Sequence, residues 1–404
     1  MKKRSIYLAC LSLAVMAMVS GCGKDSVPSK NVEHSDSVTE ADNETKPTET
    51  EFHDESGHSK ENDKKPGKHN AVLKHASRYG NYYDFLLSKA GTGNAVFSSE
   101  SLDAAFCVYS HLLTEEGRHD VEQYLGNRDY LKYENTDVFK SINRIWVNTN
   151  YDVHMNATDV EDLGYSLDMS DSKNATAEKN DYVTDQTNGF LDGTPTILNN
   201  EVIFDVMNVT YFKDKWLGGD KTLTDELYKF HNANGTTTEV NMLRGFDGTL
   251  RATDNAHAFT TSYQDGFTFT AILPDEGASL ADVDIEAFIL DKAKTVNADC
   301  RFMMPEFETK SEYEFSFDTF GIDAGVINPD IYNGDVSSVI SQVAKIKVDH
   351  KGTEAAAVTE ILVKSNAIAE EREIYEMTCD RPFVYYIYDT VNNDVAFIGV
   401  VNCK

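Results

Sequence analysis

The stretch that decides the fold is Lys345–Thr359, Lys-Ile-Lys-Val-Asp-His-Lys-Gly-Thr-Glu-Ala-Ala-Ala-Val-Thr. It begins as a strand, because apolar residues alternate with lysines up to Val348, which is the period of a half-buried β-strand. The run Asp349–Gly352 then predicts a turn. Past the turn, small or apolar residues recur at every second position from Thr353 to Val363. This pattern indicates a second strand with one buried face and one exposed face.

The side chains at the start of this second segment are unusually small. Ala355, Ala356 and Ala357 follow one another, and alanine forms strands poorly and helices well. A segment that must slide into a narrow gap between existing strands has a reason to be this small, because small side chains enter without a clash. A short alanine-rich helix or a loop is the alternative from the pattern alone.

These residues resemble the hinge of the reactive loop in the serpins, the serine protease inhibitor superfamily. The match is carried by Gly352, Thr353, Glu354, Ala355, Ala356, Ala357, Val358 and Thr359. The resemblance implies an α+β serpin fold, with three β-sheets, surrounding helices and an exposed reactive-centre loop at about residues 350–380. In that family the loop is inserted into a sheet as an added strand.

The chain begins with a predicted lipoprotein signal peptide at residues 1–22. Lys2, Lys3 and Arg4 precede an apolar run, as in secretory signals. The tetrapeptide ending at Cys22 resembles a bacterial lipobox, which implies cleavage before Cys22 and a diacylglycerol on its sulfur. An ordinary secretory signal and an uncleaved anchor are the alternatives. We expect a protein that is exported to the cell surface or beyond and touches the membrane only through its lipid.

Residues 23–70 are polar and acidic, and they predict a disordered linker because they cannot bury enough apolar surface to fold. Residues 71–404 are long enough to form one domain with a large core. The formal charge of −30 argues against nucleic acid as a partner. The linker histidines lack the spacing of metal ligands, so no metal and no cofactor is expected.

Further matches follow the order of the family. The junction Asn94–Leu102 resembles the shutter under the main sheet, where Asn94, Ser98 and Ser101 match and Ser99 replaces a usual proline. Asn208 falls in the apolar strand Val202–Phe212 as its buried polar residue, and Gln342 stands where the shutter usually has a histidine. His350 stands where a glutamate usually helps to hold the top of the sheet. The resemblance implies that both departures loosen the control of sheet opening.

Two expectations concern the ends of the domain. Only Gly126–Ile142 is left for helices that usually take several turns, so the helix across the front of the sheet is predicted to be cut down or missing. A closing hairpin is predicted from Arg381–Ile387 and Val395–Val400 around a polar turn. Cys379 and Cys403 lie almost opposite in that hairpin. Either they form a disulfide or they stay free thiols, because strand spacing must also permit the bond.

The sequence has no Gly-x-Ser-x-Gly, His-Glu-x-x-His or Walker loop, which are motifs of several enzyme classes, and we expect no catalytic residues. The resemblance implies a monomeric suicide substrate that traps endopeptidases irreversibly. A serine protease, or a papain-like cysteine protease, forms an acyl-enzyme on the loop, and the cleaved loop then inserts into the main sheet. A non-inhibitory serpin-fold surface binding protein is the alternative.

The scissile bond is predicted at Asn366–Ala367, from the usual loop length counted from His350. Counting back from Pro382 gives a later position. Lys364 would suit a trypsin-like protease, and Ala367 or Ile368 an elastase- or subtilisin-like one, since specificity follows the fit of the pocket.

Overall fold

The computed structural model describes residues 77–126, 128–132, 135–247, 249–323, 325–334, 336, 340–353 and 373–404. The predicted signal peptide and linker lie outside the described residues. So do most of the hinge, all the candidates for the scissile bond and the lipid site Cys22.

The main sheet consists of two groups of hydrogen-bonded strands. The continuous chain segment 204–215 contributes one strand to each group. One group has the order β3 (Gly164–Leu167), β2 (Phe139–Asn148), β4 (Phe204–Phe212). The other has the order β5 (Asp214–Lys215), β17 (Gly352–Thr353), β16 (Ile340–Asp349), β15 (Phe307–Phe315). Only Lys213 separates β4 from β5, so the chain passes directly from the last strand of the first group into the first strand of the second group. As predicted, the alternating residues of β16 are buried on one face.

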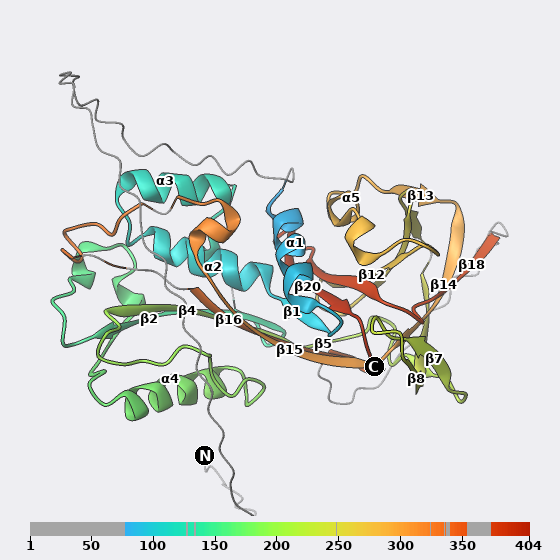
Figure 1. Cartoon of the computed structure of the whole chain (residues 1–404), viewed down its shortest axis with the longest axis horizontal. Helices are drawn as coiled ribbons and strands as arrows, with labels where there is room; N and C mark the ends of the chain where they lie inside the picture. The colour runs from blue at the N-terminus through green and yellow to red at the C-terminus, as the bar shows by residue number, and fades with distance from the viewer. Residues whose placement is uncertain are drawn as a thin grey trace, which may run out of the picture. The chain divides into compact units, whose positions relative to one another are not determined.

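Helices cover both faces of this sheet. Helix α2 (Ser99–Ser110) packs on the inner face, and its N-terminus is capped by Ser98, whose hydroxyl accepts from the backbone N–H of Ser101. Helix α4 (Ser172–Gln186) packs on the outer face, where Ala175 and Val183 meet side chains of β2 and β4. Figure 1 shows the sheet between these two helices.

The front of the sheet is therefore covered, contrary to expectation. Between Gly126 and Ile142 the described residues contain a single turn of 3₁₀-helix, η1 (Tyr130–Lys132), before β2 begins, so this segment is as short as predicted. The helix that crosses the outer face, α4, comes from later in the chain. Length alone did not reveal which segment supplies it.

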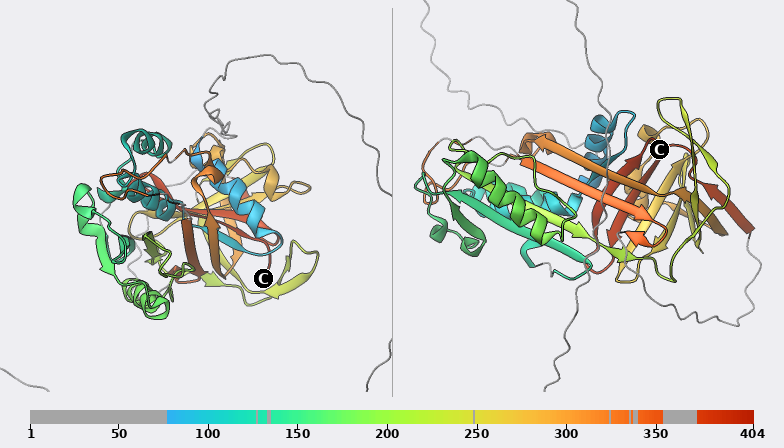
Figure 2. Two further views of the ribbon diagram at one scale, coloured as in Figure 1. Left: turned by 60° about the vertical axis from the view of Figure 1, so that its left-hand side comes forward. Right: turned by 90° about the horizontal axis from the view of Figure 1, so that it is seen from below.

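Two further sheets complete the fold (Figure 2). The larger has the order β1 (Ala95–Phe97), β20 (Asp394–Val401), β19 (Phe383–Asp389), β12 (Phe267–Pro274), β11 (Ala256–Ser262), β10 (Leu250–Ala252), β13 (Lys294–Val296). The smaller has the order β18 (Glu373–Thr378), β14 (Ala298–Pro305), β9 (Met242–Asp247), β6 (Thr222–Leu223). A separate hairpin is formed by β7 (Tyr228–His231) and β8 (Thr237–Val240). The antiparallel pair β19–β20 is the closing hairpin that the sequence predicted.

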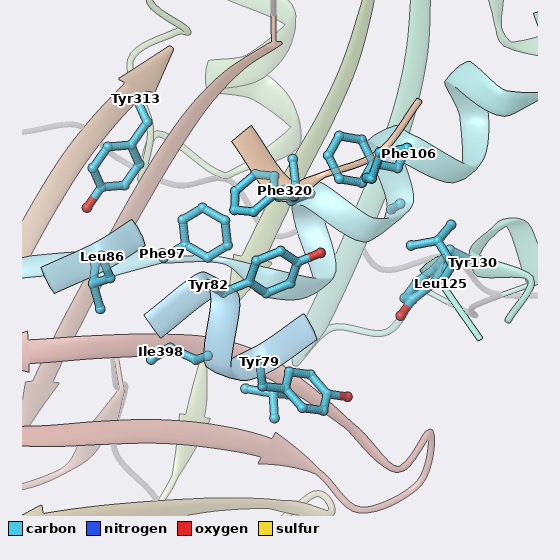
Figure 3. Close-up of a cluster of buried hydrophobic side chains, with 14 of the residues drawn as sticks. Tyr79, Tyr82, Leu86, Phe97, Phe106, Leu125, Tyr130, Tyr313, Phe320 and Ile398 are labelled. Atoms are coloured by element: carbon cyan, nitrogen blue, oxygen red, sulfur yellow. The ribbon is translucent and has the colours of Figure 1, made fainter. Parts of the chain in front are cut away.

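The remaining helices and 3₁₀ turns lie outside the two faces of the main sheet described above or connect its strands. They are α1 (Arg78–Ala90), α3 (Glu115–Tyr124) and α5 (Ile285–Ile289), with 3₁₀ turns η2 (Met155–Ala157), η3 (Glu161–Leu163), η4 (Leu280–Asp282) and η5 (Phe317–Phe320). Aromatic side chains hold α1 and α2 to the sheets (Figure 3). The ring of Tyr82 lies 5.1 Å from those of both Phe97 and Phe320, so one fully buried tyrosine joins three elements.

A buried carboxylate lies in the first turn of α2. Glu100 is fully buried, and neither of its carboxylate oxygens has a hydrogen-bond partner among the described residues. Burial penalises the charged form and raises the pKa of Glu100 well above its ordinary value, and the nearby carboxylates of Asp394 and Asp389 raise it further.

Replacing Glu100 with glutamine should therefore change how stability depends on pH. As pH rises above about 4.3, the unfolded chain loses this proton before the native protein does, so Glu100 lowers the stability of the native state. We expect Glu100→Gln to match the wild type near pH 4 and to exceed it at higher pH, by about 1.4 kcal/mol per pH unit up to the native pKa. Urea unfolding at pH 4 and pH 7 measures this, and a difference that does not change with pH would contradict it.

Candidate functional site

The first two hinge residues form a short strand in the main sheet. Thr353 pairs with Val348 of β16 on one side and with Asp214 of β5 on the other. Gly352 pairs in the same way with Asp349 and Lys215. The top of the sheet therefore already contains the start of an added strand between β16 and β5.

Gly352 is required at this position for two reasons. Its φ is +139°, which side-chain-bearing residues rarely adopt, and a Cβ atom there would lie 2.3 Å from the carbonyl oxygen of Asp214. Thr353 is 1% exposed, and its hydroxyl lies 2.9 Å from the hydroxyl of Tyr263. The start of the strand is thus closely fitted on both of its faces.

Trp216 contacts the turn that connects β16 to β17. Its indole N–H donates to the backbone oxygen of Asp349 at 2.9 Å, and its ring stacks on Tyr263 with 4.4 Å between centroids. The backbone N–H of Lys221 donates to the carbonyl of His350 at 2.6 Å. The turn between β16 and β17 is therefore held by contacts from the segment after β5.

His350 keeps an acidic partner. Its backbone N–H donates to Glu306 Oε1 at 2.8 Å, and its Nδ1 lies 2.7 Å from the same oxygen. The ammonium group of Lys404 donates to the backbone oxygen of Glu306. Burial lowers the pKa of Lys404 to about 8, against the opposing charge of Glu306. The loosened sheet opening expected from His350 stays a prediction, and the structure adds that His350 contacts Glu306 on a neighbouring segment.

Asp214 is a buried acid beside the hinge. Burial raises its pKa to about 6, although the backbone N–H groups of Asp265 and Lys215 donate to its carboxylate at 3.0 and 2.7 Å and lower it. The carboxylate therefore holds the backbone on the far side of the short strand β5.

Four of the five residues predicted for the shutter meet beneath the sheet. The side-chain amide of Gln342 donates to the backbone oxygen of Ser98 at 2.7 Å and accepts from its N–H at 3.1 Å. The hydroxyl of Ser101 lies 3.5 Å from the backbone oxygen of Asn208. The amide of Asn208 donates to Ser141 Oγ and Asn143 Oδ1 on β2, at 3.0 and 2.9 Å. Gln342 thus joins β16 to the start of α2.

Asn94 lies apart from this group. Its side-chain oxygen accepts the backbone N–H groups of Asn402 and Cys403, at 2.7 and 2.9 Å. It therefore fixes the end of the chain beside β1. Cys379 and Cys403 are free thiols in the structure, which is the second of the two alternatives left by the sequence.

Below β17 a gap separates β4 from β16. Strand β4 pairs with β2, and β16 pairs with β15, but in the described pairing the two are not joined to each other. Phe190, which follows α4, spans this gap on the outer face. Its ring lies 5.8 Å from that of Tyr211 on β4 and 4.7 Å from the ammonium of Lys345 on β16, which also lies 3.4 Å from its backbone oxygen.

Replacing Phe190 with alanine should make the gap easier to open. The change removes the ring contact with β4 and the cation–π contact with β16, the latter contributing about 0.5–1 kcal/mol at a partly exposed site. We expect the variant to convert several-fold faster, on mild heating, to a form that resists unfolding in urea. Native gels in urea follow this conversion. Phe246→Ala, which removes a ring that is 57% exposed on β9 of another sheet, is the matched control. Equal conversion of wild type and Phe190→Ala would contradict a role for Phe190.

The lower end of the gap opens into a cavity of about 360 Å³. Its walls come from α2, β4, η5, the start of β16 and the segment that precedes β4. They combine apolar side chains such as Phe106, Phe204 and Val206 with the polar side chains of Thr196, Asn199, Glu201 and Asp205. The upper part of the gap is thus flanked by buried side chains such as Phe212 and Ile346, and its lower end opens into this cavity.

Among the described residues no cluster of three or more potential metal ligands is present, and no helix is long and apolar enough to cross a membrane. A comparison with family models matches residues 81–403 to Serpin (serine protease inhibitor). The chain belongs to the serpin family.

Curated relatives of this serpin are distant. An uncharacterized serpin-like protein of Thermococcus kodakarensis is 25% identical over 65% of this chain and 66% of its own length. Iripin-1 of Ixodes ricinus is 26% identical over 58% of this chain, and Serpin A3-1 of Bos taurus is 28% identical over 59%. The matches span 63% and 60% of these two proteins, so in all three cases the chain spans less than two thirds of the relative.

Solved structures show the fold. The thermophilic serpin tengpin in its native state has a TM-score of 0.61 at 20% identity, covering 83% of this chain and 96% of that one. Human thyroxine-binding globulin, complexed with thyroxine, has a TM-score of 0.64 at 20% identity, covering 81% and 96%. The serpin fold expected from the sequence is confirmed.

Several residues of the site were not predicted from the sequence. Tyr263, Glu306 and Phe190 lie on segments far from the hinge, and no motif marks them. Trp216 follows the apolar strand predicted at Val202–Phe212, and nothing in that pattern indicates its contact with the hinge. A signal was available for Glu306 alone, since an acidic residue there could have been sought once the usual glutamate at residue 350 was seen to be missing.

Proposed function

We propose that this serpin is an irreversible suicide-substrate inhibitor of endopeptidases rather than an enzyme. The observation that carries the proposal is that Gly352 and Thr353 already pair on both sides, between β16 and β5. The strand-forming positions below them on β4 and β16 are not paired with each other. A loop cleaved beyond the hinge could therefore continue the same strand downward.

The register of that added strand supports the proposal. Continued from Thr353, it brings Ala355 opposite Ile346 and Phe212, which are both buried. It brings Ala357 opposite Ala344 and Thr210. Alanine is the side chain that enters between such buried neighbours with least displacement of them.

Further down, the inserted side chains match what they would meet. Thr359 comes opposite Gln342 and Asn208, whose amides can hydrogen-bond its hydroxyl. Ile361 comes opposite Ile340 and Val206, which line the cavity. The order of small, polar and larger apolar residues in the loop thus follows the order of buried apolar, amide and cavity-lining residues along β4 and β16.

In the proposed mechanism, proteolysis stops at the acyl-enzyme stage. The protease hydroxyl, or thiol, bonds to the carbonyl carbon of Asn366, the bond to Ala367 breaks, and the new amine keeps the proton from the nucleophile. Insertion then moves the acylated protease away from its cleavage geometry before water can release it. Each backbone hydrogen bond gained contributes about 0.5–1.5 kcal/mol, which drives the movement. The native state is kinetically trapped above the inserted one.

The test is incubation of the purified protein with trypsin-, elastase-, subtilisin- and papain-like proteases, followed by denaturing gels. We expect at least one band near the summed mass that survives denaturation, and the first residue of the released fragment identifies the scissile bond. The nicked protein should also unfold at a higher temperature than the intact one. Cleavage by every protease, with neither the band nor the rise in Tm, would instead favour a serpin-fold binding protein.

We also propose that the protein is exported and held at the cell surface by a lipid on Cys22. The lipobox-like sequence before Cys22 supports this. Metabolic labelling with a radioactive fatty acid tests it, since the label should disappear in Cys22→Ser.

A further inference from the structure

Two lysines flank the next position of the added strand. Lys213 lies between Phe212 and Asp214, which are 3% and 4% exposed and point into the core. Lys347 lies between Ile346 and Val348, which are 1% and 0% exposed. Because side chains alternate along a strand, both lysines belong to the outer face of the sheet.

The register brings these two lysines to one level. Thr353 stands opposite Asp214 on β5 and Val348 on β16. One residue further, the antiparallel pairing leads to Lys213 on one side and Lys347 on the other. The next residue of the chain is Glu354, which lies outside the described residues. In a strand continued from Thr353 by the same alternation, its side chain would belong to the outer face.

We propose that Lys213 and Lys347 are positioning residues that receive the carboxylate of Glu354 when the cleaved loop inserts. The inference rests on the proposed inhibitory function and extends it to these residues. Directly opposed side chains on neighbouring strands have Cβ atoms about 4.5–5.5 Å apart, and an opposite-charge pair at that distance contributes about 0.2–1 kcal/mol. A central glutamate forms two such pairs at once.

The present contacts of Lys347 leave it able to make this exchange. Its ammonium lies 3.7 Å from Asp349 Oδ2, while the other oxygen of Asp349 accepts the backbone N–H of Lys351 at 2.8 Å. Glu308, directly opposite Lys347 on β15, instead pairs with Lys345 at 3.2 Å. Glu354 would thus compete with Asp349 for one half-exposed lysine, whose side chain is 46% exposed.

The positive charges of Lys213 and Lys347 should favour the first step of insertion, in which Glu354 enters between the two strands. Acidic residues outnumber basic ones by 67 to 37 in this chain, so an inserted carboxylate would generally meet like charge. The two lysines instead attract it at the point where insertion must begin. They therefore bias the cleaved hinge toward insertion and against release of the protease.

The test uses Lys213→Gln, Lys347→Gln, their double variant and Glu354→Gln, with Lys140→Gln as control. Lys140 lies on the outer face of β2, one strand away from the gap. Two quantities are measured: moles of inhibitor consumed per mole of protease trapped, and the rise in Tm after the loop is nicked. Each single lysine substitution should raise the amount of inhibitor consumed per protease trapped about 1.5- to fivefold. Lys140→Gln should leave this amount unchanged.

The combined variant decides between specific pairing and general charge. If Glu354 is the partner, adding Glu354→Gln to the double lysine variant should change little, because the pairs are already lost. Raising the salt concentration should increase the amount of inhibitor consumed per protease trapped for the wild type, and it should leave that amount unchanged for the double variant. The inference is overturned, and the proposed function is not, if the wild type traps protease and the lysine variants consume no more inhibitor than it does. The same holds if the effects of the lysine and Glu354 substitutions on inhibitor consumption are additive. If wild type shows neither a trapped complex nor a rise in Tm, the proposed function is overturned and the inference with it.

Discussion

Replacing Thr353 with arginine should turn this serpin from an inhibitor into a substrate. Thr353 is 1% exposed and faces the core, where its hydroxyl meets Tyr263 and its neighbours across the strands are Val348 and Asp214. An arginine would bring a charge into this site, and although Asp214 is near, its carboxylate is already engaged by two backbone N–H groups. Placing a poorly paired charge in a buried site costs several kcal/mol. The intact variant avoids this cost by leaving the two-residue strand β17 unpaired, whereas the inserted form must bury the arginine, so the cost opposes insertion.

The outcome depends on a competition between insertion and deacylation. A barrier only 1.4 kcal/mol higher slows insertion about tenfold, so we expect at least ten times more inhibitor to be consumed per protease trapped. Denaturing gels should show the cleaved protein in place of the covalent complex. The nicked Thr353→Arg protein should also lose most of its rise in Tm.

Thr353→Ser is the matched control, because it keeps the hydroxyl and removes one methyl group. It should trap protease within a few-fold of the wild type. Wild-type trapping by Thr353→Arg would mean that the cleaved loop does not enter through the space between β16 and β5. The proposal would then lose its main support.

The sequence predicted those parts of the fold that follow from local pattern. The alternation in Lys345–Val348 predicted β16, since a strand with one buried face needs little else to be recognised. The hairpin β19–β20 was predicted for the same reason, from two apolar runs around a polar turn. The hinge was recognised because its small residues form a continuous motif.

Contacts between distant segments were not predictable in this way. Glu306 and His350 are separated by 44 residues, and Phe190 meets the sheet from a segment with no regular pattern. Asn94 matched a motif, yet the structure places it at the end of β20, since its oxygen is satisfied there by two N–H groups. A motif identifies a residue type at a spacing, but its partners depend on how strands align after folding.

Replacing His350 with glutamate should loosen the top of the sheet. The new carboxylate would lie beside that of Glu306, which now accepts from the backbone N–H of residue 350 and lies 2.7 Å from the imidazole. Two adjacent carboxylates repel each other when both are ionised. We expect His350→Glu to convert on mild heating, several-fold faster than wild type, either to a self-inserted form or to chains of molecules that exchange loops. Native gels distinguish the two products, since only the chains give a ladder.

A second substitution separates charge repulsion from a general loss of fit. Glu306→Gln removes the carboxylate but leaves an amide oxygen to accept from the same backbone N–H, and it places no new cation near the ammonium of Lys404. If repulsion is the cause, His350→Glu should accelerate conversion much less on the Glu306→Gln background than on the wild type. Equal acceleration on both backgrounds would show that Glu306 is not the partner that matters. The top of the sheet would then depend on the hydrogen bond from Trp216 to Asp349, and Trp216→Phe should reproduce the faster conversion.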